Sequence, residues 1–268
     1  LSLHDALPIS VHAQTPQALR ARFAHPPLWT PEVVLEKKFM NRQPAHASVL
    51  VPIVLREQPM VLLTQRTAHL STHSGQVAFP GGRADAEDVS TADTALREAE
   101  EEVGLERRFV EVLGVLPTYV TGSSFIITPV VALVQPDCVL HPNPCEVADV
   151  FEVPLAFLLN PAHHQRHMFE WEGVRREWFS MPYEQGGKTH FIWMAKRIFI
   201  SGVPRPVCCA IFIDSCWRDG GASARAAQMH ATPVSLPSMS FFAILFALLI
   251  EQARPLARTN PIHAGLRA

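Results

Sequence analysis

Residues 79–105 read FPGGRADAEDVSTADTALREAEEEVGL, and this stretch decides the fold. Its second half predicts a helix over 90–103, because Ser90 is a suitable N-cap and Gly104 a natural residue after the last turn. We expect one buried face on this helix, an apolar stripe at helical spacing made of Ala92, Ala95, Leu96, Ala99 and Val103.

A second face of the helix carries carboxylates. Glu98, Glu101 and Glu102 recur at i, i+3 and i+4, and Arg97 is placed to pair with Glu101. Near a helix C-terminus the dipole disfavours each anion by about 0.3–1 kcal/mol, and like charges add a similar penalty. A divalent cation would reverse both terms, and carboxylates suit Mg²⁺ or Mn²⁺. An arbitrary run of glutamates is more often a solvated acidic face.

The segment before the helix favours ligand binding over that simpler reading. Pro80, Gly81 and Gly82 predict a turn where the backbone can approach a ligand, and a free carbonyl there can join a metal's coordination shell. Asp85 and Asp88 lead from this turn into the helix. A glycine pair alone is weak, but its combination with the acidic helix is specific.

Gly82 and the run 97–105 together resemble the Nudix box, Gx5Ex7REUxEExGU. Two departures are present: Asp88 stands where the box has its first glutamate, and eight residues rather than seven separate it from Arg97. Both departures are typical of the coenzyme A pyrophosphatase branch of that family.

The upstream sequence is similar to the signature of the same branch. LLTQR at 62–66, Gly75 and FPGG at 79–82 have its spacing, whereas Thr67 and Ser71 depart from it, the latter replacing an arginine. Segments 116–122, 128–130 and 146–155 also resemble the branch. The resemblance covers about residues 45–193.

The resemblance implies a Nudix α/β/α sandwich with a mixed central sheet. It also implies hydrolysis of the pyrophosphate of coenzyme A, or of acyl-CoA, to 4′-phosphopantetheine and adenosine 3′,5′-bisphosphate. Glu98, Glu101 and Glu102 would hold Mg²⁺ or Mn²⁺ with the Gly82 carbonyl, and Arg97 would orient the glutamates. Glu101, Glu102 and a loop carboxylate such as Glu146 are alternative general bases.

Several further residues are candidates for substrate binding. Arg66, His69 and His73 precede the glycine turn and are placed to read the 3′-phosphate or the adenine, although a surface arginine and solvated histidines are alternatives. Tyr119 could stack on adenine or line a pantetheine channel, and core packing is equally compatible with it. Gly81 is expected to border the pyrophosphate.

Other functions fit parts of the sequence. Within the same fold, the substrate could be another nucleoside diphosphate derivative such as ADP-ribose. A non-catalytic nucleotide sensor is less compatible, because Arg97 and all three metal-side glutamates are intact. The hypothesis of a membrane-associated protein is supported only by the apolar run 241–250. This run is about half the length that a bilayer crossing needs.

Composition excludes other classes of function. The 268 residues have a net charge of −2, which gives no reason to expect a nucleic-acid partner. Five cysteines without a CxxC pair argue against a disulfide framework or a structural zinc, so we expect a reducing cytoplasm. Residues 1–193 show no membrane segment, and the sequence sets no oligomeric state.

The chain divides into three parts. Residues 1–44 are expected to be an N-terminal extension with a short helix near 16–23, in which 1–10 resemble translated adaptor sequence and are left out of the functional argument. Residues 45–193 form the catalytic domain, with strands near 48–55, 60–65, 75–79, 109–116, 126–134, 149–153, 167–171, 175–182 and 190–193, and a short helix at 155–159. One central helix among short strands excludes a doubly wound fold.

Residues 194–268 have a different character. Their net charge is +5, against −7 for residues 1–193, and 194–238 lack any sustained periodicity. From Met239 the sequence is similar to a membrane family of cobalamin biosynthesis. We interpret this tail as a non-native, frameshifted read-through and expect 194–238 to be poorly ordered.

Overall fold

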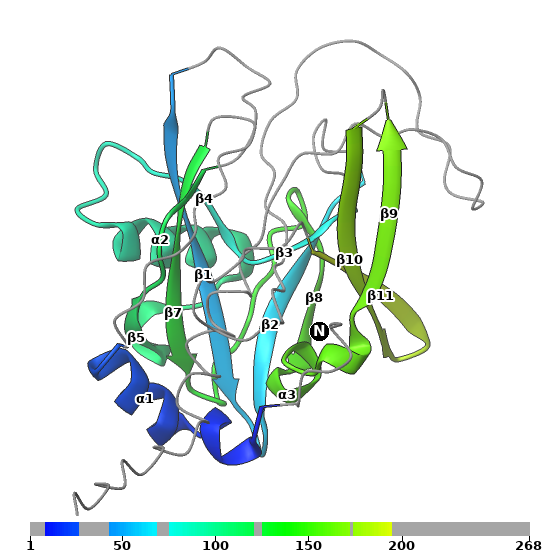
Figure 1. The fold of residues 1–268 in the computed structure, drawn as a ribbon. Helices are drawn as coiled ribbons and strands as arrows, with labels where there is room; N and C mark the ends of the chain where they lie inside the picture. The colour runs from blue at the N-terminus through cyan, green and yellow to red at the C-terminus, as the bar shows by residue number, and fades with distance from the viewer. Residues whose placement is uncertain (1–8, 27–42, 69–74, 121–124, 172–173, 195–268) are drawn as a thin grey trace, which may run out of the picture.

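The fold is built around a mixed sheet (Figure 1). The computed structural model describes residues 9–26, 43–68, 75–120, 125–171 and 174–194. At the centre of the sheet, β1 (Ala45–Leu55) and β7 (Phe125–Val134) run parallel over ten paired positions, from Ala45 opposite Phe125 to Val54 opposite Val134. The expectation of an α/β fold with a mixed central sheet is confirmed.

The other strands of this sheet pair antiparallel with their neighbours. The path runs β3-β2-β1-β7-β5, and β4, β6 and β8 pair with β1, β7 and β2. Their bounds are β2 Pro59–Arg66, β3 Val77–Ala78, β4 Gly81–Arg83, β5 Val110–Val115, β6 Tyr119–Val120 and β8 Val147–Pro154. The short strand β4 is where a turn was expected, and that expectation is wrong because Gly82 pairs with Ser48 of β1.

A second sheet and the helices complete the described fold. The strands β9 (Gln165–Trp171), β10 (Val174–Gln185) and β11 (Lys188–Met194) form an antiparallel three-stranded sheet. The helices are α1 Pro16–Ala24, α2 Thr91–Val103 and α3 Leu155–Leu158, with 3₁₀ turns at Val11–Gln14, Arg107–Phe109 and Pro161–His163.

The central strands are buried on both faces, which produces two apolar cores. Alternate residues of β1 point to opposite sides, so Val51 and Ile53 join one core while Leu50 and Val54 join the other. The first core contains residues of α1, α3 and the second sheet, and the second contains the apolar stripe of α2. This arrangement explains why the central strands read as continuous apolar runs.

The N-terminal helix α1 packs against the mixed sheet. Leu19 is fully buried in the first core, and Arg20 pairs with Glu111 near the start of β5 at 2.7 Å. The Thr15 hydroxyl caps the helix by accepting the N–H of Ala18. The division of the chain at residues 45 and 194 stays a prediction, and 195–268 lie outside the described residues.

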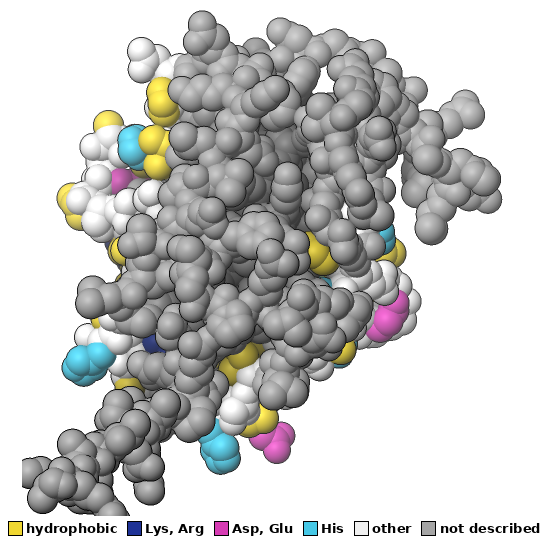
Figure 2. All heavy atoms as spheres, in the orientation of Figure 1, with side chains coloured by type: hydrophobic (Ala, Val, Ile, Leu, Met, Phe, Trp, Pro, Cys, Tyr) yellow, Lys and Arg dark blue, Asp and Glu magenta, His cyan; other side chains and the backbone are white. Residues whose placement is uncertain are grey.

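Two surface expectations concern membranes and nucleic acids. Among the helices of the described residues, none has the length and apolar character needed to cross a membrane. On the face drawn in Figure 2, the visible Asp, Glu and His side chains lie at the margins.

We predict that Leu19→Ala lowers the free energy of unfolding by about 2–4 kcal/mol, since it leaves a cavity in the first core. Urea denaturation of the full chain measures this loss. Val11→Ala is the matched control, because Val11 is 73% exposed. Equal stability of the two variants would contradict the docking of α1.

Candidate active site

The helix α2 carries the candidate site, and both of its ends are capped as predicted. The Ser90 Oγ accepts the N–H of Asp93 at 3.1 Å. Gly104 has a φ of +68° and donates its N–H to the Glu100 carbonyl at 2.9 Å. A Cβ at Gly104 would lie 2.8 Å from the backbone nitrogen of His141, so a glycine is required there both by the backbone angle and by space.

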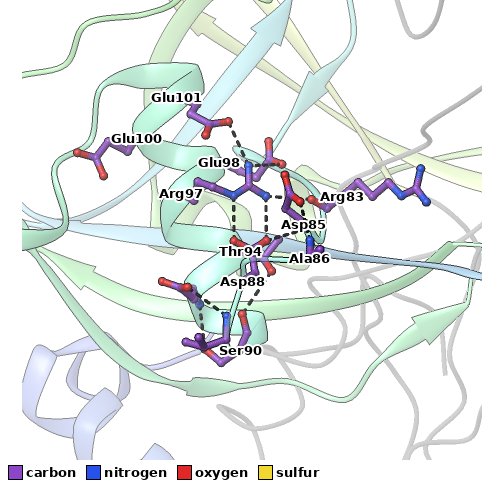
Figure 3. Close-up of polar contacts among 12 residues, drawn as sticks. Arg83, Asp85, Ala86, Asp88, Ser90, Thr94, Arg97, Glu98, Glu100 and Glu101 are labelled. Atoms are coloured by element: carbon purple, nitrogen blue, oxygen red, sulfur yellow. Dashed lines mark hydrogen bonds and ion pairs between the residues drawn. The ribbon is translucent and has the colours of Figure 1, made fainter.

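Arg97 is the centre of the polar network on this helix (Figure 3). Its Nε and one terminal nitrogen donate to the two carboxylate oxygens of Asp88, each at 2.9 Å. The same terminal nitrogen donates to the Arg83 carbonyl at 3.0 Å, and the other contacts Glu98 at 3.0 Å and Glu101 at 3.1 Å. One guanidinium therefore ties the loop before α2 to the helix and holds two of the predicted catalytic carboxylates.

Asp88 is the residue that departs from the Nudix box, and the structure shows what it does. Its two-point pairing with Arg97 holds the pKa of its carboxyl well below the usual range. The Asp85 N–H adds a third hydrogen bond at 2.8 Å. With an aspartate at position 88 and one additional residue before Arg97, the two side chains still form a bidentate ion pair. The Asp88 side chain is only 5% exposed in it.

Gly82 allows the Glu98 carboxylate to lie directly against the backbone of β4. A Cβ at Gly82 would overlap that carboxylate, and a Cβ at Gly81 would lie 2.6 Å from the Val49 Cα on β1. Burial is the main cause that raises the pKa of Glu98, opposed by Arg97. The paired glycines therefore allow β4 to pack closely against β1 and α2.

Glu102 is the most enclosed of the acidic residues on α2, with only 5% of its surface exposed. One carboxylate oxygen accepts the Gly81 N–H at 3.1 Å, and the other lies 3.5 Å from a terminal nitrogen of Arg66. Burial raises the pKa of Glu102 to about 7, and the negative charges of Glu98 and Glu146 add to this rise. The carboxylate is thus prepared to hold or release a proton near neutral pH.

The remaining acidic residues of this region lie in wetter surroundings. The Glu101 side chain is 60% exposed, and Figure 3 shows it bending toward Arg97 while Glu100 points away. Glu146 lies on a loop that is anchored to α2 through the Asn143 N–H, which donates to the Glu102 carbonyl at 2.9 Å. The loop thereby brings a further carboxylate to the end of α2.

The structure brings most of the predicted site residues together. Arg66, Gly81, Gly82, Arg97, Glu98, Glu101 and Glu102 form one continuous set of contacts. His69 and His73 lie outside the described residues. Tyr119 is in β6, where its backbone pairs with Ile127. The roles of all these residues stay predictions.

Several partners in this network were not predicted, among them Asp88, which pairs with Arg97 at two points. The Arg83 carbonyl accepts from Arg97, and Glu102 lies against Arg66. Every residue has a backbone carbonyl, so the sequence alone does not indicate which one accepts a hydrogen bond. The Arg66 contact joins residues 36 positions apart, so it depends on how β2 and α2 pack.

Comparison with known proteins decides the family. The model of the NUDIX domain matches residues 44–178, about half of the chain. The chain belongs to the Nudix family. Among its curated relatives, the uncharacterized Nudix hydrolase NudL of Photorhabdus laumondii is 44% identical over 148 residues, 55% of this chain and 77% of that protein. NudL of Yersinia enterocolitica is 45% identical over 148 residues, which cover 55% of this chain and 74% of that protein.

Some solved structures are similar to part of this chain at lower identity. A binary complex of the Caenorhabditis elegans Ap4A hydrolase is 18% identical, with a TM-score of 0.36, and the match covers 41% of this chain and 80% of that one. The Nudix domain of Shewanella oneidensis NrtR, complexed with ADP ribose, is 24% identical with a TM-score of 0.34, over 46% of this chain and 79% of that one.

Nudix hydrolases generally use divalent cations, and the donors on α2 fit one. Within the described part of the chain, no three His, Cys, Asp or Glu side chains converge as a formed metal cage. Glu98 and Glu102 are nevertheless hard oxygen donors one turn apart, and burial raises the pKa of both. A divalent cation would offset the penalty of charging them.

We predict that the metal-free protein loses stability between about pH 4.5 and pH 7. The folded state keeps the Glu102 proton in this window while the unfolded state releases it, so stability falls as the pH rises. Glu102→Gln should therefore be more stable than the wild type at pH 8, by the order of 2 kcal/mol, with the advantage disappearing near pH 4.5.

Urea denaturation in EDTA at several pH values measures this difference. Glu100→Gln is the matched control, since Glu100 is an exposed acid of the same helix. If Glu102→Gln and Glu100→Gln follow the same pH profile, Glu102 does not carry the raised pKa.

Proposed function

We propose that this chain hydrolyses the pyrophosphate bond of coenzyme A or acyl-CoA with Mg²⁺ or Mn²⁺. The observation that carries the proposal is the meeting of two signature segments at one carboxylate. Arg66, from the LLTQR segment, and Gly81, from FPGG, both contact Glu102. Both segments resemble the signature of the coenzyme A branch, and both contact the same carboxylate of the candidate site.

In the proposed reaction, water adds to one phosphorus of the P–O–P bridge and the bridging oxygen leaves with the other phosphate. The products are 4′-phosphopantetheine and adenosine 3′,5′-bisphosphate. A divalent cation held by Glu98, Glu101, Glu102 and the Gly82 carbonyl would supply charge neutralisation and a more acidic water.

The chain's own residues have distinct tasks in this scheme. Arg97 fixes the side chains of Glu98 and Glu101. The acidic turn of α2, residues 98–102, therefore needs little rearrangement when a cation binds. Glu101, Glu102 and Glu146 are the candidates that accept the water proton, and Glu102 is held in place by the Gly81 N–H and Arg66. Arg66 provides positive charge beside it.

We predict that Glu101→Gln and Glu102→Gln each lower kcat for CoA by at least about a hundredfold, because a general base and metal-dependent charge neutralisation are lost. The assay follows CoA, ADP-ribose and diadenosine tetraphosphate with Mg²⁺ and with Mn²⁺, and Glu100→Gln serves as the control. CoA should be the best substrate of the wild type. Near-wild-type turnover of CoA in both variants would refute the acidic site, and a preference for ADP-ribose would refute the substrate.

The position of Arg66 bears on what it recognises. Its contact with Glu102 favours a role at the pyrophosphate over a role at the 3′-phosphate. We predict that Arg66→Ala lowers kcat/KM about ten- to a hundredfold, the value of one charge-assisted hydrogen bond, on CoA and 3′-dephospho-CoA alike.

Arg83→Ala is the matched control for this test, since the Arg83 side chain is exposed and extends away from Arg97 in Figure 3. A loss confined to CoA would instead show that Arg66 reads the 3′-phosphate.

A further inference from the structure

The loop before β8 brings a carboxylate, that of Glu146, close to the acidic turn of α2. Burial is the main cause that raises the pKa of Glu98 and of Glu102, and the negative charge of Glu146 raises both further. A divalent cation responds to the same negative charge as a proton does, with twice the charge of a proton. Glu146 therefore lies where its charge favours a cation at the acidic turn.

Hydrogen bonds to the end of α2 fix where this loop begins. The Asn143 N–H donates to the Glu102 carbonyl at 2.9 Å, and the His141 N–H donates to the Val103 carbonyl at 2.8 Å. Carbonyls in the last turn of a helix have no partner within the helix, so these bonds satisfy groups that otherwise need water. The loop is thus tied to the same turn that carries the acidic residues.

Asn143 then folds the loop into a tight turn. Its Oδ1 accepts the Cys145 N–H at 3.1 Å, and its backbone carbonyl accepts the N–H groups of Glu146 at 3.1 Å and Val147 at 2.8 Å. An asparagine side chain that bonds to the backbone two residues on stabilises such a turn. The three N–H groups of residues 145–147 are therefore all bonded to one residue.

Thr67 holds the opposite side of the same turn. This residue follows Arg66 at the end of β2 and is only 3% exposed. Its N–H donates to the Glu146 carbonyl at 3.0 Å, and its hydroxyl donates to the Cys145 carbonyl at 3.3 Å. The backbone of Glu146 is thus bonded on one side to Asn143 and on the other to Thr67.

A β-bulge where β2 pairs with β8 sets this register. The pairs on its two sides are Gln65 with Asp149 and Arg66 with Val147, which leaves Ala148 as an extra residue in β8. Without the extra residue, a regular antiparallel register would place Val147 opposite Thr67. The bulge shifts the loop by one residue, so the acid takes that place.

We propose that Thr67 and Asn143 are positioning residues, which hold Glu146 so that its charge strengthens cation binding at the acidic turn. The two side chains bond to the backbone of residue 145, so their effect reaches the cation through Glu146. The proposal rests on the proposed function for the cation alone, and it does not depend on CoA as the substrate.

Mn²⁺ binding to the metal-free full chain, measured by electron paramagnetic resonance of free Mn²⁺, tests the proposal. Thr67→Val removes the hydroxyl with little change of shape, whereas Thr67→Ser keeps it. Asn143→Ala removes the side-chain acceptor of the turn. Asn160→Ala is its matched control, because the Asn160 Oδ1 accepts the Ala162 N–H at the same distance, 3.1 Å, in the 3₁₀ turn after α3. Glu146→Gln gives the effect of losing the charge itself.

We expect Glu146→Gln to weaken Mn²⁺ binding about tenfold, because one negative charge near the cation is lost. Thr67→Val and Asn143→Ala should each weaken it about threefold to fivefold, while Thr67→Ser and Asn160→Ala bind like the wild type. Combined with Glu146→Gln, neither Thr67→Val nor Asn143→Ala should weaken binding further, which distinguishes action through Glu146 from a general loss of structure.

Wild-type Mn²⁺ affinity in Glu146→Gln, or in both Thr67→Val and Asn143→Ala, would overturn the proposal. Losses from Thr67→Val and Asn143→Ala that are equally large with and without Glu146 would overturn it as well. The expected affinities in a protein that leaves CoA intact would overturn the proposed substrate and keep the positioning role. CoA hydrolysis by the wild type, with the same Mn²⁺ affinity in every variant, would do the reverse.

Discussion

The Arg97 guanidinium is the interaction on which the candidate site depends. It binds Asp88 at two points, donates to the Arg83 carbonyl and contacts Glu98 and Glu101. A planar group with five N–H donors can satisfy all of these acceptors at once, which a lysine could not. The loop, the short strand β4 and the helix α2 are therefore held as one unit before any ligand arrives.

The acidic turn of α2 places its carboxylates in contrasting environments. Glu102 is enclosed by Arg66, the Gly81 N–H and the core, and its pKa rises to about 7. Glu101 is mostly exposed and paired with Arg97. Residues of one chemical type on a single helical turn thus differ in burial and in hydrogen-bond partners, and burial is the main cause that raises the pKa of Glu102.

Local patterns predicted the elements well. The Ser90 cap, the Gly104 terminus and the apolar stripe sufficed for α2, because each acts within a few residues. The apolar runs likewise marked β1 and β7 as strands, whereas their central, parallel pairing was not predicted. The strand β4 was missed because its pairing with Ser48 and Val49 joins segments more than thirty residues apart, and paired glycines usually mark turns. The Arg66 contact with Glu102 depends on tertiary packing in the same way.

The central claim is that the Arg97-ordered acidic turn is a divalent-cation site, and Mn²⁺ binding to the metal-free full chain tests it most directly. Electron paramagnetic resonance of free Mn²⁺ compares the wild type with Glu98→Gln and with Glu100→Gln, whose side chain points away from Arg97. We expect Glu98→Gln to weaken binding by at least about tenfold, because one charged oxygen donor is lost from a buried set, while Glu100→Gln binds like the wild type. Equal Mn²⁺ affinity in all three proteins would contradict the account.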